Sequence, residues 1–328
     1  MRYLFHLSTV PKYLDWFYND WSEIQAFAKK HQMDGVEIMI HNDYDINQVP
    51  QDFAYGMHLM FFPMWLDFWR GNAKGVADTV GGPEEIKALY GGTEPQCMVD
   101  QYKEQYKIAK ELGVKYMVFH VSHVLVEDTF RWKYDYTDRE ILEATIELVN
   151  AAFPKDEDGP MLLFENLWWP GLTYCDPELT KWFIEQINYS NKGYLLDTSH
   201  LILTNPDIWN ENQAVDYMRQ IIKNLGATKD YIKGMHINKT LPRNYMRQNH
   251  LYKLESYQSA KTPWQKTGVL KKHLSSLDCH KPFDHPAIAQ LINDINPEFC
   301  VFEVNPSARH ELAHYLNQQN KALGRMNP

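Results

Sequence analysis

The chain alternates short apolar runs rich in β-forming residues with longer segments of helical periodicity, and this alternation yields eight strand-like runs. Such an alternation predicts strand–helix units around a parallel sheet. Eight units are the number that closes a (β/α)8, or TIM, barrel, and 328 residues suit one barrel with long loops. We therefore predict a single α/β domain over residues 1–328. Its strands are expected at 3–6, 35–39, 55–59, 115–120, 161–165, 193–197, 232–236 and 299–303.

Two kinds of signal mark where helices begin between these strands. Thr137 followed by Glu140 matches a capping box, in which each side chain bonds a free backbone N–H of the first helical turn. Asp176 followed by Pro177 places an acidic cap before a proline whose missing N–H costs nothing there. No repeat or Pro-rich linker divides the chain, which also favours one domain.

Composition excludes several classes of protein. With 33 Lys and Arg against 42 Asp and Glu, the formal net charge is -9, which disfavours binding to an extended nucleic-acid duplex because that needs clustered cations. The absence of a long apolar run or a signal-like start predicts a cytoplasmic protein with no membrane partner. Four scattered cysteines indicate neither a disulfide framework nor a zinc ribbon. Nothing in the sequence indicates the oligomeric state.

Ionisable residues gather where the predicted strands end. In a parallel barrel these ends meet on one face, so their side chains converge from distant positions in the sequence. Carboxylates mixed with neutral imidazoles suit Zn, Mn or Fe, whereas Mg normally takes oxygen ligands. We predict a divalent metal site, with zinc favoured over Mn or Fe and with one to three ions. The expected ligands are His58, His120, Glu165, Asp197, His200, His236, Asp278, His280 and Glu303.

Two segments, 60–95 and 239–272, are too long to be simple connections. The first opens with an aromatic run that predicts either a ring-stacking platform or a hydrophobic lid. The second carries eight Lys and Arg against one Glu, a net +7 that leaves -16 for the rest of the chain. This contrast predicts a small anionic substrate, with a merely solvated surface as the alternative. The expected substrate contacts are Phe62, Trp65, Trp168, Asn238, Lys239, Arg243 and Arg247.

The strand ends resemble the xylose isomerase-like TIM barrel superfamily, the AP endonuclease family 2 group that includes sugar isomerases, epimerases and endonuclease IV. The resemblance covers most of the chain, and the family as a whole implies one core metal. The remaining histidines and the Asp-x-His motif at 278–280 are similar to the endonuclease IV branch, which implies three metals. The implied sets are His58 and His120 with bridging Glu165, then Asp197, His236 and Glu303, then His200, Asp278 and His280.

Three functions are compatible with these residues. The leading prediction is a metal-dependent hydrolase of a phosphoester, a phosphodiester in a small-molecule or nucleotide-like substrate, with Glu165 and Glu303 as catalytic carboxylates. The alternative is a one-metal sugar or polyol isomerase or epimerase, in which the same glutamates exchange a proton with a substrate carbon. His58 and His120 would then bind substrate. The third is a binding protein that keeps the metal site without turnover.

Overall fold

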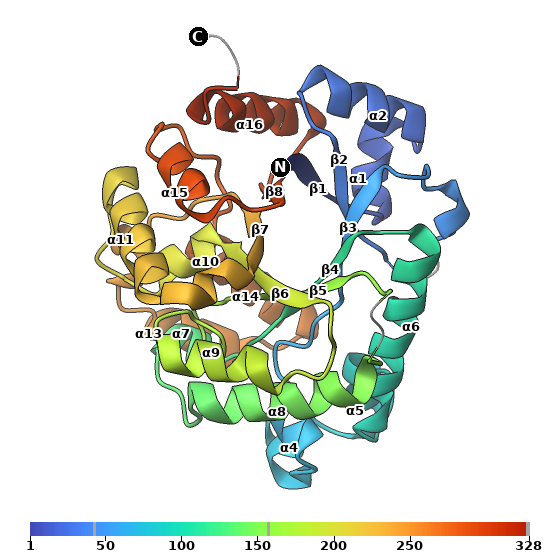
Figure 1. Cartoon of the computed structure of the whole chain (residues 1–328). Coiled ribbons are helices and arrows are strands. Elements are labelled where there is room, and N and C mark those ends of the chain that lie inside the picture. The colour runs from blue at the N-terminus through green and yellow to red at the C-terminus, as the bar shows by residue number, and fades with distance from the viewer. Residues whose placement is uncertain (42–43, 156–157, 326–328) are drawn as a thin grey trace.

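The computed structural model describes residues 1–41, 44–155 and 158–325. Eight parallel strands form a closed barrel in chain order, and β8 pairs with β1 (Figure 1). Each predicted strand is present, with ends within two residues of those expected. The strands are β1 Arg2–Ser8, β2 Gly35–Met39, β3 Ala54–His58, β4 Tyr116–His120, β5 Met161–Glu165, β6 Lys192–Asp197, β7 Ile232–His236 and β8 Phe299–Phe302.

Helices surround the barrel in Figure 1 and connect its strands. The α-helices are α1 Pro11–Leu14, α2 Trp21–Lys30, α3 Leu66–Trp69, α4 Ala73–Thr79, α5 Pro83–Tyr90, α6 Gln96–Leu112, α7 Asp128–Arg131, α8 Asp138–Ala152, α9 Pro177–Gln186, α10 Thr198–Leu203, α11 Glu211–Asn224, α12 Arg243–Met246, α13 Leu251–Ser259, α14 Pro263–Leu277, α15 Ile288–Ile295 and α16 Arg309–Ala322. Short 3-10 helices are η1 Asp15–Phe17, η2 Ile46–Gln48 and η3 Gly226–Tyr231.

The helix starts read from the sequence form as expected. Thr137 accepts a hydrogen bond from the backbone N–H of Glu140, whose carboxylate accepts from the N–H of Thr137. Asp176 accepts from the N–H of Leu179 at 2.9 Å, ahead of Pro177. Because each cap satisfies a backbone donor that lacks an intrahelical partner, the starts of α8 and α9 are fixed locally.

Of the three clusters of buried apolar side chains among the described residues, the two largest belong to the barrel and its surrounding helices. One lies between the strands and the surrounding helices. The other fills the barrel interior, where the rings of Tyr116 on β4 and Phe299 on β8 lie 4.5 Å apart. Each fully buried aliphatic side chain there contributes roughly 1.5–3 kcal/mol relative to exposure. The interior set is Leu4, Tyr116, Val118, Leu163, Leu195, Phe299 and Val301.

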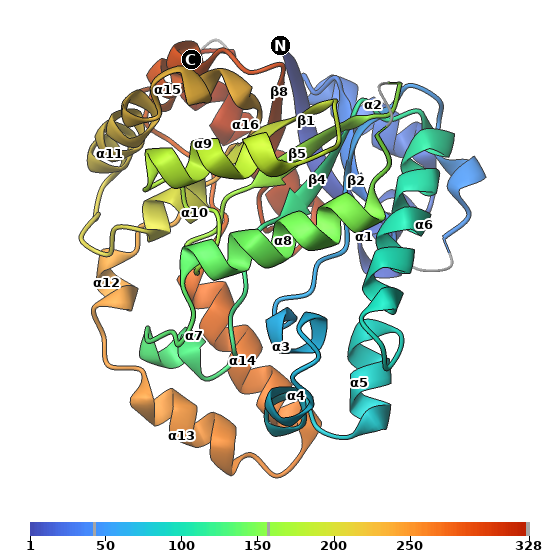
Figure 2. The same ribbon diagram turned by 60° about the horizontal axis from the view of Figure 1, so that its bottom comes forward.

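Both long segments contain helices of their own. Residues 60–95 form α3, α4 and α5, and residues 239–272 form α12, α13 and most of α14. Figure 2 shows α13 and α14 in orange and α3 to α5 in blue to cyan, extending from the barrel on the same side. Of the helices in the described part of the chain, none has the length and apolar character needed to cross a membrane.

Candidate metal centre

Strand periodicity aims the candidate ligands into the barrel. Side chains two residues apart face the same side of a strand, and Leu163 belongs to the interior core, so Glu165 also faces inward at the end of β5. Five further candidate ligands also lie two residues after a strand position that faces the barrel interior. The pairs are Gly56 and His58, Val118 and His120, Leu195 and Asp197, Gly234 and His236, and Val301 and Glu303.

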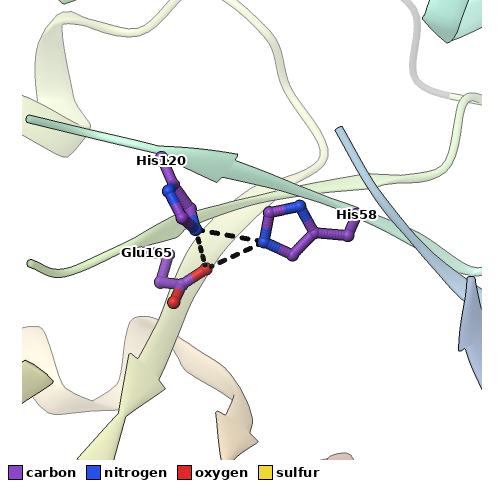
Figure 3. Close-up of side chains that lie close together, drawn as sticks. All are labelled: His58, His120 and Glu165. Carbon is purple, nitrogen blue, oxygen red and sulfur yellow. Dashed lines mark hydrogen bonds and ion pairs between the residues drawn. The ribbon is translucent and has the colours of Figure 1, made fainter. Parts of the chain in front are cut away.

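The first group of possible metal ligands comprises His58, His120 and Glu165, drawn in Figure 3. The two imidazoles approach each other through their Nε2 atoms at 3.0 Å. Glu165 Oε2 lies 3.0 Å from Nε2 of His120 and 3.5 Å from Nε2 of His58. Side chains from β3, β4 and β5 therefore point their donor atoms at one place.

The second group comprises Glu165, Asp197, His236 and Glu303. Nδ1 of His236 lies 3.0 Å from Glu303 Oε2, 3.4 Å from Glu165 Oε1 and 3.7 Å from Asp197 Oδ2. Glu165 belongs to both groups, so one carboxylate could bridge two ions.

The third group comprises Asp197, His200 and His280. Asp278, expected to complete this set, places Oδ2 3.3 Å from Nε2 of His200 and 2.7 Å from Nε2 of His280. His280 adopts a left-handed φ of 44°, a conformation that costs a residue with a side chain about 1–3 kcal/mol and is concentrated at functional sites. All nine predicted ligands thus lie in one connected cluster.

Outer hydrogen bonds orient the imidazoles. For His58, His200 and His280, Nδ1 lies 2.9–3.0 Å from a backbone carbonyl oxygen, which leaves Nε2 to face the cluster. His236 does the reverse, because its Nε2 contacts Glu37 and its Nδ1 faces the cluster. Histidines that bind metals characteristically give their second nitrogen to a carbonyl or carboxylate in this way.

Glu37 was not among the predicted site residues. Its Oε1 lies 3.0 Å from Nε2 of His236, and its Oε2 accepts a hydrogen bond from the Tyr116 hydroxyl at 2.8 Å. Burial opposes ionisation, yet His236 and His6 lower the pKa of Glu37 to about 2. Gly56 leaves room for the Tyr116 ring, since a Cβ there would lie 2.1 Å from it. Strand periodicity could have identified Glu37, because it faces inward two residues after Gly35. It lies before the end of β2, however, and the predicted ligands were sought at the strand ends.

The cluster contains buried polar atoms with no hydrogen-bond partner. They include both carboxylate oxygens of Glu165, Oε2 of Glu303 and Nδ1 of His236. These atoms have close neighbours but lack hydrogen-bond geometry, and a buried unsatisfied polar atom costs about 1–3 kcal/mol. A divalent cation would satisfy several at once, and the mixture of imidazole and carboxylate fits Zn, Mn or Fe. The residues therefore fit a metal.

Electrostatics support the same interpretation. Burial raises the pKa of Asp197 to about 7. Burial opposes protonation of His280, but Asp278 and Glu303 raise its pKa to about 10. Burial also works against the charged form of Glu165, whereas His120 and His236 hold its pKa well below the usual range. Glu165 thus keeps its charge and His280 its proton, and a metal that binds here must displace protons from the cluster.

Neighbouring polar side chains hold the two aspartates in place. The amide of Asn238 donates to Asp197 Oδ2 at 2.8 Å. The Ser199 hydroxyl donates to Asp278 Oδ1 at 2.8 Å. Asn238 is fully buried, which corrects its predicted role: it positions Asp197 and does not face a substrate cavity.

Two cavities open onto the cluster. The larger cavity, about 560 Å³, is lined by candidate ligands together with Phe61, Trp168, Trp169 and Leu274. The side cavity, about 270 Å³, is lined by Tyr13 and Trp16 as well as by residues at the ends of β1 and β8. Trp168 therefore lies where a substrate contact was predicted, and Phe61 is an addition from the same aromatic run. Another cavity, of about 640 Å³ beside α11 and η3, is lined by none of the candidate residues.

The other predicted substrate contacts require correction. Phe62 packs in the core against Tyr90 and Tyr102. Trp65 is also buried and donates its indole N–H to the carbonyl of Ser122 at 2.8 Å. Neither ring lines the larger cavity or the side cavity, and their packing matches the alternative interpretation of the aromatic run as a hydrophobic lid.

The cations of the basic segment 239–272 also lie outside both cavities. Lys239 forms an ion pair with Glu211. Arg247 donates to Asp207 at 2.5 Å, and Arg243 is exposed without lining either cavity. The predicted contacts of these three residues with an anionic substrate are therefore not supported.

Comparison with known proteins agrees with the barrel fold. Endonuclease IV from Thermus thermophilus is 15% identical over 99% of this chain and 100% of its own, with a TM-score of 0.51. The IOLI protein with a binding zinc atom is 14% identical over 99% of each chain, at 0.52. L-ribulose 3-epimerase is 12% identical over 98% of this chain and 93% of its own, at 0.51.

At these identities the solved structures establish a shared fold but do not establish a shared activity. No match to this sequence was found among curated proteins. The model of the xylose isomerase-like TIM barrel family, AP endonuclease 2, matches residues 91–319, and the chain belongs to that family.

Proposed function

We propose that the protein is a divalent-metal-dependent hydrolase of phosphodiesters in small molecules, with zinc as the favoured metal and Mn or Fe as alternatives. The observation that carries the proposal is the joining of three ligand groups through Glu165 and Asp197. Several ions held together suit phosphoester hydrolysis because they share the charge on the attacking and leaving oxygens. A one-metal isomerase would use only the second group.

Bound divalent ions would supply Lewis acidity and lower the pKa of water. The carboxylates that could take up the proton of the attacking water are Glu165 and Glu303, whose buried oxygens include several without a hydrogen bond. Glu37 and Asn238 hold His236 and Asp197 in register with them. In the overall reaction the water oxygen bonds to phosphorus and one P–O ester bond breaks. The leaving oxygen takes a proton, which gives a phosphomonoester and an alcohol.

The walls of the larger cavity favour this reaction over isomerisation of a sugar. A substrate rich in hydroxyl groups needs several placed hydrogen-bonding partners. Apart from the candidate ligands, the polar residues of the described chain that line this cavity are His6, Ser275 and Asn305. The remaining walls are apolar.

Turnover of a generic diester tests the proposal. Protein loaded with Zn²⁺, Mn²⁺ or Fe²⁺ should release 4-nitrophenol from bis(4-nitrophenyl) phosphate, and the Glu165→Gln variant should not. Ketose and polyol panels should remain unchanged. Interconversion of ketoses without diester turnover would contradict the hydrolase and support the isomerase.

A further inference from the structure

The larger cavity and the side cavity meet at the candidate metal centre. They share five lining residues, among them Glu303 and His280. A group held at the metal centre therefore has free space on two sides. The shared residues are His6, Met39, His280, Glu303 and Asn305.

Aromatic rings form the walls of the larger cavity directly beside the ligand imidazoles. The Phe61 ring lies 4.2 Å from the ring of His120, and the Trp168 ring lies 5.0 Å from that of His200. Trp169 packs on Trp168 at 4.2 Å. Leu274 of α14 closes another side. This cavity offers flat apolar surfaces within reach of the metal centre.

The side cavity, which also borders Glu303, likewise has aromatic and apolar walls. Tyr13 and Trp16 meet edge to face, with ring centroids 5.0 Å apart. Both line the cavity together with Leu7 and Leu312. At about 270 Å³ it lies just below the roughly 300–1,000 Å³ range of whole small-molecule sites, a size for one substituent.

Cations contribute nothing to either wall. Among the residues that the structure describes, neither cavity is lined by Lys or Arg. A polyphosphate or a nucleotide with several phosphates would need such partners. The metal centre would thus meet the charge of a single phosphate, and the cavities would take uncharged groups.

We propose that the substrate is a phosphodiester with a flat, uncharged ring group on each of its two ester oxygens. One ring lies between Phe61 and Trp168 in the larger cavity, and the other lies beside Trp16 in the side cavity. This inference rests on the proposed function, because it assigns the phosphate to the metal centre. It makes the side cavity the feature that selects diesters with two rings.

Binding of three diesters of equal charge tests the inference. Isothermal titration of the zinc-loaded protein would compare dimethyl, methyl phenyl and diphenyl phosphate. Each added ring should tighten binding by about tenfold, since aromatic contacts add to the burial of apolar area. Trp16→Ala and Trp168→Ala should each remove one of these two steps. Trp16→Phe should retain the step, and Trp209→Ala, which alters an exposed tryptophan, is the matched control.

The outcomes separate the two proposals. Zinc-loaded protein that binds the diesters in the expected order but hydrolyses none would contradict the hydrolase alone. Equal affinity for all three diesters overturns the two-ring inference, whether or not turnover occurs. A preference for diphenyl phosphate that survives both Trp16→Ala and Trp168→Ala overturns it as well. Metal content and circular dichroism of each variant show that the comparison concerns folded protein.

Discussion

Two groups of buried histidines in this molecule have opposite surroundings. At the candidate metal centre, Asp278 and Glu303 outweigh burial and raise the pKa of His280 to about 10. Beneath the basic segment, burial lowers the pKa of His273 to about 4, with His250 and Lys253 lowering it further. The first group concentrates negative charge around atoms that lack partners. The second keeps its imidazoles neutral for packing against α7, where Nε2 of His273 lies 2.8 Å from the Thr129 carbonyl.

The net charge of a sequence segment therefore does not show where in the folded molecule that charge acts. The basic segment is part of the long connection that contributes Leu274 and Ser275 to the larger cavity, and none of its cations lines that cavity. This connection therefore contributes part of the wall of the larger cavity and no positive charge. The strand ends, in contrast, direct buried carboxylates and imidazoles at one point.

The largest effect is expected from Glu165→Gln, which removes a carboxylate shared by two ligand groups. Loss of an outer partner of a metal ligand already costs about 10–100-fold, so losing a shared ligand should lower diester turnover by more than about a hundredfold. Kinetics and metal analysis check this, with the exposed Glu185→Gln as control. Unchanged turnover and metal content would show that the cluster is not the site.

A smaller loss is expected from Glu37→Gln. The substitution weakens the contact that directs Nδ1 of His236 toward the cluster, so metal affinity or turnover should fall about 10–100-fold. Tyr116→Phe, which removes only a hydrogen bond to Glu37, should cost less. Competition against a chromophoric chelator measures the affinities. If the Glu37 variant binds metal like the wild type, the contact does not orient His236.

His273→Gln tests the neutral group through pH. The folded-state pKa of His273, about 4, lies below its usual 6.5, so between these values the unfolded chain binds more protons. The stability that His273 contributes is therefore complete above pH 6.5 and is lost as pH falls toward 4. Urea unfolding at several pH values should show a flatter profile for the variant than for wild type or His310→Gln. Identical profiles would contradict the assignment.

The smallest effect is expected from Arg247→Ala. Its guanidinium pairs with Asp207, and both side chains are more than half exposed, where ion pairs contribute about 0–1 kcal/mol. Diester kcat/KM should change less than about threefold, as for the matched Arg219→Ala, which breaks the exposed pair with Asp294. A tenfold rise in KM confined to Arg247→Ala would show that the basic segment reaches the substrate.

The sequence was sufficient to predict the barrel and the convergence of the candidate ligands at its strand ends, because both follow from short-range periodicity. Because β5 ends at Glu165, that side chain faces the barrel interior independently of the conformation of the loops. Glu37 obeys the same period, yet it was missed because it lies two residues before the end of β2.

The side-chain positions in the two long segments could not be predicted in the same way, because they depend on contacts with residues far away in the sequence. Lys239 pairs with Glu211 on α11. Trp65 donates to Ser122 across 57 residues of chain. Residue type alone did not distinguish the buried Phe62 from Phe61, which faces the larger cavity. Trp16 belongs to η1, and nothing in the sequence of that segment indicated a functional role.

The number of metal ions bound per chain decides whether the joined ligand groups form a clustered metal centre. Elemental mass spectrometry of protein purified without chelators or added metal would give that number. The joined ligand groups predict two or three ions of zinc, manganese or iron per chain, falling in the Glu165→Gln variant. A single ion, unchanged when His58 and His120 are replaced by alanine, would contradict the clustered centre and with it the proposed hydrolase.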